Sequence, residues 1–295
     1  MGRNTQQLSR RGCILALAGA PLLAGKETKI LVAGHPWVYA ARRPNNDIYE
    51  ILDQIFADMR AANLDAIELM HTALAADDAV ARIRELSKWH SLPVIGTSFG
   101  ANMWDRTQHD AILGQSRLVI ERVSALGGRT LGTSVGSTRQ RKTEEQLDAQ
   151  AELLRRIMAT CKDHGVVLNL HNHTYEVADG EYDLKGTLAR IPEVRLGPDI
   201  NWLIRAGVDP VDFIARYGTR IVYAHLRDQK ADGKWCEAMG EGTTDYAAIA
   251  AAFRKSGFHG DVAIELAHER DFQPTRSYGE SFAMSRKYVR RVMGW

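Results

Sequence analysis

The sequence predicts one α/β domain over residues 26–295, folded as a (β/α)8 barrel, which is also called a TIM barrel. Two observations lead to this prediction. Four short stretches rich in Val, Ile and Leu end on residues that can bind a metal, and these ends, His171, Asp199, His225 and Glu265, lie 26 to 40 positions apart. Residues with helical periodicity fill each gap. Strand and helix alternating about every 30 residues is the pattern of this barrel, whose functional groups collect at the carboxyl ends of its strands.

The first half of the domain alternates in the same way. A helix is predicted for residues 46–64, because apolar side chains recur at steps of three and four from Ile48 to Met59. Another opens with Thr143 and Gln146, a capping pair that satisfies early backbone N–H groups. The predicted strands of this half are 29–34, 66–70, 92–96 and 127–132, and the predicted helices are 46–64, 77–89, 108–126 and 143–165.

The second half supplies four more strands, so the count reaches eight. They are predicted at residues 166–171, 194–199, 220–225 and 260–265, with helices at 182–191, 210–217, 246–256 and 280–293. Because every crossover carries a helix, we expect a parallel sheet with right-handed connections. The main alternative is a doubly wound open sheet, and it is disfavoured because no Gly-x-Gly-x-x-Gly follows the first strand.

Composition and charge narrow the class of protein. The chain has 295 residues, of which 45% are hydrophobic and 25% charged, as is ordinary for a globular protein with a large core. Its formal net charge is only +2 and its Lys and Arg residues are scattered, so nucleic acid is not an expected partner. Cys13, Cys161 and Cys236 have neither metal-site spacing nor the even count of a disulfide framework. No segment is apolar for long enough to span a membrane.

Residues 1–25 differ from the rest of the chain and resemble an export signal of the twin-arginine type. Arg10 and Arg11 precede an uncharged run that ends at Ala24, which is too short to span a bilayer but has the length of a signal apolar region. Two details depart from the pattern. Cys13 stands where such signals usually carry Phe, and a proline follows the small residues that match a signal cleavage site. We expect a periplasmic or exported protein. The alternative is an additional N-terminal helix on a cytoplasmic protein.

Asp199, His225 and Glu265 predict a divalent metal site. These side chains would meet at the barrel mouth, where a cation compensates the cost of burying charged and polar groups together. The fourth ligand is either His171, from its strand end, or Glu176, which would fold back from the following loop. We favour Glu176, because three carboxylates with one imidazole suit Mn2+ or Mg2+ and leave room for sugar oxygens.

Several motifs resemble the sugar phosphate isomerase/epimerase family of xylose isomerase-like TIM barrels. They follow the family's order, span most of residues 29–295, and are found at 170–176 (LHNHTYE), 199–202 (DINW), 206–210 (AGVDP), 224–228 (AHLRD), 240–242 (GEG) and 264–266 (IEL). The resemblance implies Glu, Asp, His and Glu ligands from the last four strands, with the two glutamates flanking the sugar as acid and base. Two positions depart from it. His171 stands where many members have the first Glu, and Trp202 stands where many have a histidine three residues after the Asp.

From these features we predict a divalent-metal-dependent isomerase or epimerase of a small keto sugar or sugar derivative. A metal that chelates a carbonyl and the adjacent hydroxyl stabilises the enediolate that forms when the proton alpha to the carbonyl leaves. Glu265 and Glu176 are the candidate acid–base pair, with His173 as the alternative base. Mn2+ is the expected ion, and Mg2+, Co2+ and Zn2+ are alternatives.

Other functions are compatible with the same barrel. Enediolate chemistry also expels a beta leaving group, so a lyase or hydratase of 3-keto glycosides is the main alternative, and the resemblance implies it for exported relatives with Trp at the position of Trp202. An abasic-site endonuclease would need further His and Glu ligands and a basic surface. A non-catalytic sugar-binding barrel would fit the changed ligand position. His35, Trp37, Trp202 and Arg227 are the candidate sugar contacts, and the sequence is compatible with a homo-oligomer.

Overall fold

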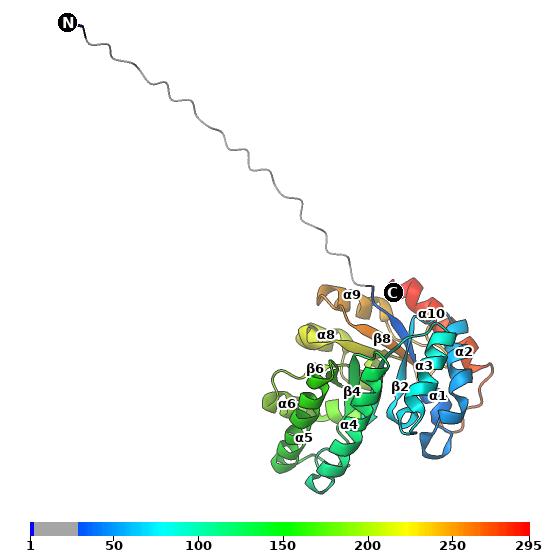
Figure 1. Ribbon diagram of the computed structural model, residues 1–295. Helices are drawn as coiled ribbons and strands as arrows, with labels where there is room; N and C mark the ends of the chain where they lie inside the picture. Colours follow the sequence, from blue (N-terminus) through cyan, green and yellow to red (C-terminus); the bar gives the residue numbers. More distant parts are fainter. Residues whose placement is uncertain (3–28) are drawn as a thin grey trace.

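The computed structural model describes residues 1–2 and 29–295, and it is a parallel eight-stranded barrel with helices around its outside (Figure 1). The hydrogen-bonded strand order is β6-β5-β4-β3-β2-β1-β8-β7, and bridges from Leu196 to Ile221 and from Asp199 to His225 close the ring. The strands are β1 (Val32–His35), β2 (Ala66–Met70), β3 (Val94–Gly100), β4 (Thr130–Ser134), β5 (Val167–Leu170), β6 (Arg195–Leu196), β7 (Tyr223–Leu226) and β8 (Asp261–Glu265). The barrel predicted from the sequence is confirmed. The predicted export signal falls almost wholly outside the described residues.

Helices occupy the crossovers between the strands. They are α1 (Trp37–Ala40), α2 (Leu52–Ala61), α3 (Ala79–Trp89), α4 (His109–Ala125), α5 (Glu144–Asp163), α6 (Thr174–Arg190), α7 (Ile200–Arg205), α8 (Pro210–Tyr217), α9 (Tyr246–Lys255) and α10 (Tyr278–Met293). Short 3-10 turns are η1 (Pro44–Asn46), η2 (Tyr49–Ile51), η3 (His71–Leu74), η4 (Arg106–Gln108) and η5 (Gly218–Arg220). The predicted capping pair at the start of α5 is confirmed, because the hydroxyl of Thr143 accepts the backbone N–H of Gln146 at 3.3 Å.

The barrel interior has an apolar part and a polar part that follow each other along the strands. A small apolar cluster is formed by Ala33, Ala66, Ile95, Tyr223 and Ala263. Side chains alternate across a strand, so residues two positions apart face the same side of the sheet. The residues two positions after the five cluster members are all polar, and they are His35, Glu68, Thr97, His225 and Glu265. The strand pattern therefore directs polar groups into the interior at the carboxyl ends of the strands.

The segment after β5 differs from its prediction. A loop was predicted before a helix at 182–191, whereas α6 already begins at Thr174 and is interrupted at Ala178–Glu181, where the backbone is not helical. Asp179 and Glu181 have positive φ angles of 51° and 66°, which are uncommon for residues with side chains. The early helical turn changes the direction of Glu176, as described below.

The predicted strand 194–199 is shorter in the structure. Only Arg195 and Leu196 are paired in β6, because Pro198 has no N–H to donate to a ladder. The short helix α7 follows and was not predicted. It begins at Asp199, whose carboxylate accepts the backbone N–H groups of Asn201 at 2.8 Å and Trp202 at 3.0 Å. In the described part of the chain, every helix is too short or too polar to cross a membrane.

Candidate metal and sugar site

Four side chains converge at the carboxyl ends of strands β5 to β8. His171 follows β5, Asp199 follows β6, His225 lies in β7 and Glu265 ends β8. One nitrogen or oxygen from each lies within 4.8 Å of the others. Asp199, His225 and Glu265 are buried and His171 is partly buried. The convergence of the four strand ends that the sequence predicts is therefore present in the structure.

Arg227 joins the two carboxylates of this cluster. Its Nη2 lies 2.9 Å from Oδ2 of Asp199 and 2.9 Å from Oε1 of Glu265. Burial raises the pKa of Asp199, which the positive charge of Arg227 only partly opposes. Burial also acts to raise the pKa of Glu265, but Arg227, His35 and His225 outweigh it, so that pKa lies well below its usual range. Glu265 is therefore an ionised carboxylate at neutral pH.

A third buried carboxylate, Glu68 of β2, contacts the cluster from the opposite side of the barrel. Oε2 of Glu68 lies 2.6 Å from Nε2 of His225, and Oε2 of Glu265 lies 2.5 Å from Nδ1 of the same ring. Burial acts to lower the pKa of His225, but the charges of Glu68 and Glu265 outweigh it and raise that pKa well above its usual value. Sequence reasoning missed Glu68. The signal available was a single carboxylate within an otherwise apolar strand, Ala66–Met70.

The donor set and its charge fit a divalent cation. In ionised form, Glu68, Asp199 and Glu265 carry three negative charges, and the positive charges of Arg227 and protonated His225 balance only two of them. Burial, together with the nearby ring of His225, lowers the pKa of His171 well below its usual value, so this imidazole is neutral and has a free lone pair. Two imidazoles and two carboxylates are ligands that Mn2+, Zn2+ and Co2+ accept.

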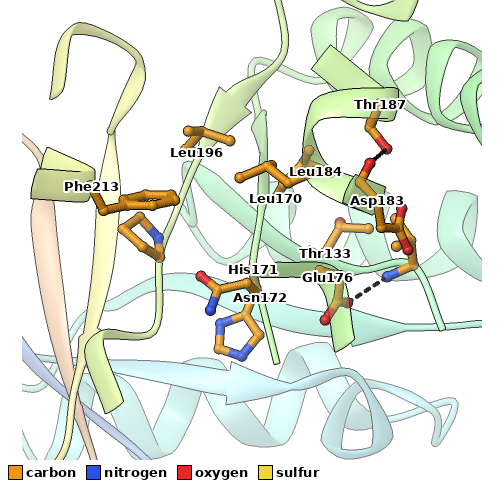
Figure 2. Close-up of a pocket in the computed structure, with 12 residues that line it drawn as sticks. Thr133, Leu170, His171, Asn172, Glu176, Asp183, Leu184, Thr187, Leu196 and Phe213 are labelled. Carbon is orange, nitrogen blue, oxygen red and sulfur yellow. Dashed lines mark hydrogen bonds between the residues drawn. The ribbon is translucent and has the colours of Figure 1, made fainter. Parts of the chain in front are cut away.

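Glu176, the fourth ligand favoured by the sequence, lies outside this cluster. Its Oε1 accepts the hydroxyl of Ser134 at 2.9 Å and the backbone N–H of Val135 at 3.4 Å, and its Oε2 accepts the backbone N–H of His173 at 2.7 Å. Figure 2 draws Glu176 and the imidazole of His171 as separate groups, with the carboxylate turned toward a backbone nitrogen. Glu176 caps the first turn of α6, and the structure brings His171 to the cluster in its place.

His173 lies between the metal-binding cluster and two aromatic side chains. Its ring centroid is 5.1 Å from that of His171 and 5.6 Å from that of Trp202. Nδ1 of His173 is 3.2 Å from the hydroxyl oxygens of both Ser134 and Tyr175. Burial acts to lower the pKa of His173, but the carboxylate of Glu176, whose Oε2 lies 3.8 Å from Nδ1 of His173, outweighs it and raises the pKa.

A cavity of about 850 Å³, named here the mouth cavity, opens beside the cluster. Its volume lies within the ~300–1,000 Å³ typical of small-molecule sites. All four sequence-predicted sugar contacts line it, namely His35, Trp37, Trp202 and Arg227. So do three members of the cluster and His173. Trp235 also lines it, with its ring 5.5 Å from that of Trp202.

Comparisons with known proteins agree with this architecture. A family model described as xylose isomerase-like TIM barrel matches residues 56–288. An inosose dehydratase from Geobacillus kaustophilus (strain HTA426) is 24% identical over 176 residues, which are 53% of this chain and 56% of that protein. The chain therefore matches little more than half the length of this curated relative.

Solved structures share the same barrel. An L-ribulose 3-epimerase has a TM-score of 0.72 at 19% identity, with 90% of this chain and 95% of that chain covered. A 3-keto-D-glucoside 4-epimerase from E. coli has a TM-score of 0.65 at 17% identity, with 88% of this chain and 100% of that chain covered. At these identities the likeness establishes the common fold.

Proposed function

Because the chain belongs to the family of xylose isomerase-like TIM barrels, we propose that it is a divalent-metal-dependent isomerase or epimerase of a keto sugar or sugar derivative. The observation that carries this proposal is the convergence of His171, Asp199, His225 and Glu265 beside the mouth cavity. Chemistry at a parallel barrel is expected at this end, where the strands finish.

The four converging side chains would hold the ion, with His171 as the fourth ligand in place of Glu176. A divalent cation bound there polarises a carbonyl oxygen and stabilises the negative charge that develops when the neighbouring C–H loses its proton. Glu68 has a separate role. Its carboxylate would accept a hydrogen bond from Nε2–H of His225 and so leave Nδ1 of that ring directed toward Glu265 and the metal-binding cluster.

Glu265 and His173 are our candidates for the proton transfers. Glu265 lines the mouth cavity and is ionised, so its carboxylate can accept a proton. His173 lines the same cavity, and its raised pKa allows it to hold a proton near neutral pH and return it to the substrate. Glu176 would act through His173, because its oxygens already accept hydrogen bonds from Ser134 and the backbone. It is thus a positioning residue in this proposal.

The tryptophans of the mouth cavity would orient the sugar and exclude water. Trp202 and Trp235 meet at 87°, and the guanidinium carbon of Arg227 lies 5.5 and 5.2 Å from their ring centroids. The indole N–H of Trp235 is fixed by the side-chain oxygen of Asn201 at 2.7 Å. Aromatic faces held in this way suit the C–H faces of a sugar ring.

A lyase or hydratase acting on 3-keto glycosides is the second candidate function. Removal of the same proton is followed by loss of a leaving group when the beta carbon carries one, and His173 is placed to protonate that group. Trp202 favours this candidate, because the family resemblance links a Trp at this position to relatives that act on 3-keto glycosides. The related inosose dehydratase is itself named for the removal of water.

Hydrogen exchange with solvent tests the proposal. Mn2+-loaded protein would be incubated in D2O with a panel of keto sugars and 3-keto glycosides, and products followed by NMR. We expect deuterium at the carbon next to the carbonyl, with a new epimer or isomer for the first function and an eliminated product for the second. His173→Gln should slow exchange about 100-fold or more while keeping the metal. The exposed Glu193→Gln is the matched control. Absence of exchange in metal-loaded protein would overturn the proposal.

We also propose that the protein is exported, as residues 1–25 predict. Cell fractionation of the full chain tests this, and Arg10→Lys with Arg11→Lys should retain the protein in the cytoplasm. Unchanged fractionation of the double variant would contradict a twin-arginine signal.

A further inference from the structure

A second cavity of about 650 Å³ adjoins the mouth cavity, and we name it the side trough. The two cavities share Gly100, Ser134 and His173 in their linings, so they meet where β3, β4 and β5 end. The first turns of α4 form the outer wall of the trough through Ala111, Ile112 and Gln115. The metal-binding side chains do not line it. A ligand held at the cluster could therefore extend past His173 into the side trough.

The lining of the side trough combines amides and hydroxyls with small apolar side chains, and the one group in it that can carry a positive charge is His173, at the boundary with the mouth cavity. Asn102, Gln108, Gln115, Ser137 and Tyr175 contribute amides and hydroxyls, and the lining includes no Asp, Glu, Lys or Arg. Among the described residues, the amides of Asn102 and Gln115 make no hydrogen bond to the protein, so their donors and acceptors are free for a ligand. Amides and hydroxyls together match the hydroxyl groups of a neutral sugar.

A phosphate or carboxylate does not fit this lining. Anions are usually held by Arg, by Lys or by free N–H groups at a helix start. Here the turn before α4 is already capped by Asp105, whose carboxylate accepts the backbone N–H of Thr107 at 3.0 Å and the side-chain N–H of Gln108 at 2.7 Å. The negative charge of Asp105 would repel an anion from this end of the trough.

The loops after β3 and β4 approach each other closely beside Asn102. Gly136 has a positive φ of 79°, and a Cβ at this position would lie 2.5 Å from the amide oxygen of Asn102 and 2.7 Å from the carbonyl oxygen of Ala101. Only glycine allows the loops after β3 and β4 to approach this closely. The side trough is therefore walled by two loops packed against each other.

We propose that the side trough binds a second, uncharged sugar ring, so that the substrate is a glycoside whose oxidised ring lies at the metal-binding cluster. This inference rests on the proposed function. The tryptophans and three members of the cluster line the mouth cavity, where the oxidised ring would bind, whereas the amides of Asn102 and Gln115 line the side trough. The bond between the two rings would cross the boundary formed by Ser134 and His173.

Binding of two keto sugars of different size tests the inference. Mn2+-loaded protein would be titrated by calorimetry with 3-keto-glucose and with the 3-keto derivative of trehalose, a neutral disaccharide. We expect the disaccharide to bind about tenfold more tightly. Ala111→Trp, which fills the trough from α4, should remove this advantage. Leu118→Trp, on the same helix but outside the trough, is the matched control and should keep it. Asn102→Ala and Gln115→Ala should each weaken only disaccharide binding, by about two- to tenfold.

The outcomes separate this inference from the proposed function. Equal binding of the two sugars, binding of neither, or an equal loss of both in Ala111→Trp would overturn the second-ring site. Tighter binding of the 3-keto derivative of trehalose 6-phosphate would overturn its uncharged character. Deuterium exchange without a preference for the disaccharide would refute the second-ring site and leave the proposed activity standing. A disaccharide preference without exchange would support the trough and refute the proposed activity.

Discussion

The carboxylate of Glu68 and the imidazole of His225 lie 2.6 Å apart, between β2 and β7, which are not neighbours in the sheet. This contact crosses the barrel interior and joins the cluster to the half of the barrel that supplies no metal ligand. Carboxylates that accept the second N–H of a metal-binding histidine fix its orientation and raise its basicity.

Glu68→Gln is expected to weaken Mn2+ binding by about 10- to 100-fold. The amide can still accept the N–H of His225, but it no longer supplies the charge that makes the ring a strong ligand. Competition with a metal-sensitive dye measures the affinity, and urea unfolding of the metal-free protein checks that the fold is retained. An Mn2+ affinity equal to that of the wild type would mean that Glu68 contributes to packing and not to metal binding.

His171→Ala and Glu176→Gln distinguish the two candidates for the fourth ligand. We expect His171→Ala to lower metal affinity about 100-fold or more, because it removes a nitrogen donor from the cluster. Glu176→Gln should leave the bound metal nearly unchanged, since Glu176 instead caps α6. Metal content after dialysis measures both. Loss of metal from Glu176→Gln with retention in His171→Ala would reverse the assignment.

Lys142→Met is expected to destabilise the protein by about 3–5 kcal/mol. Nζ of Lys142 is buried and lies 2.6 Å from both Oε1 of Gln150 and Oδ2 of Asp183. Burial already raises the pKa of Asp183, so removing its cation leaves a carboxylate without compensation. Urea unfolding measures the loss. Lys142→Met with Asp183→Leu should recover part of it, and a double variant no more stable than the single one would contradict the explanation.

Asp65→Asn should change the pH dependence of stability. Burial acts to raise the pKa of Asp65, but Lys29, the backbone N–H of Val32 and Arg286 outweigh it and lower the pKa. A carboxyl group with a lowered folded-state pKa stabilises the fold above its unfolded pKa of about 3.9, and this contribution disappears as pH falls through the folded-state value. We therefore expect Asp65→Asn to cost about 2 kcal/mol at pH 7 and progressively less as the pH falls below about 3.9.

Denaturant unfolding between pH 3 and 7 measures this dependence. The exposed Asp53→Asn, which removes a surface partner of His90, is the control and should cost under about 1 kcal/mol throughout. An Asp65→Asn penalty that does not change with pH would contradict the assignment of its charge.

The site was predictable where it depends on repetition along the chain. Asp199, His225 and Glu265 could be assigned because each ends an apolar stretch at barrel spacing, and parallel strands bring such ends together. Glu68 could not be assigned in this way, because its importance comes from a partner 157 positions away. A lone Glu in a strand has no local pattern that reveals such a partner.

The position of Glu176 shows how a local interaction changed the predicted ligand set. The interval from His173 to Glu176 is the spacing of a capping box, and the structure forms one there. Reading the segment as a loop left the carboxylate free to reach the metal, whereas the helical turn uses it to satisfy backbone N–H groups. Similarly, Asp199 starts the unpredicted helix α7 while also facing the cluster.

The closure of the barrel depends on the same residues that would hold the ion. In the described chain, β6 and β7 are joined by only two isolated bridges, and the one nearer the mouth pairs Asp199 with His225. A cation bound by both of their side chains would hold β6 and β7 together at this junction. Removal of the cation should loosen the junction between β6 and β7 before the other strand pairs of the barrel. The backbone N–H of His225, which donates to the carbonyl of Pro198 at 2.9 Å, should then exchange faster with solvent.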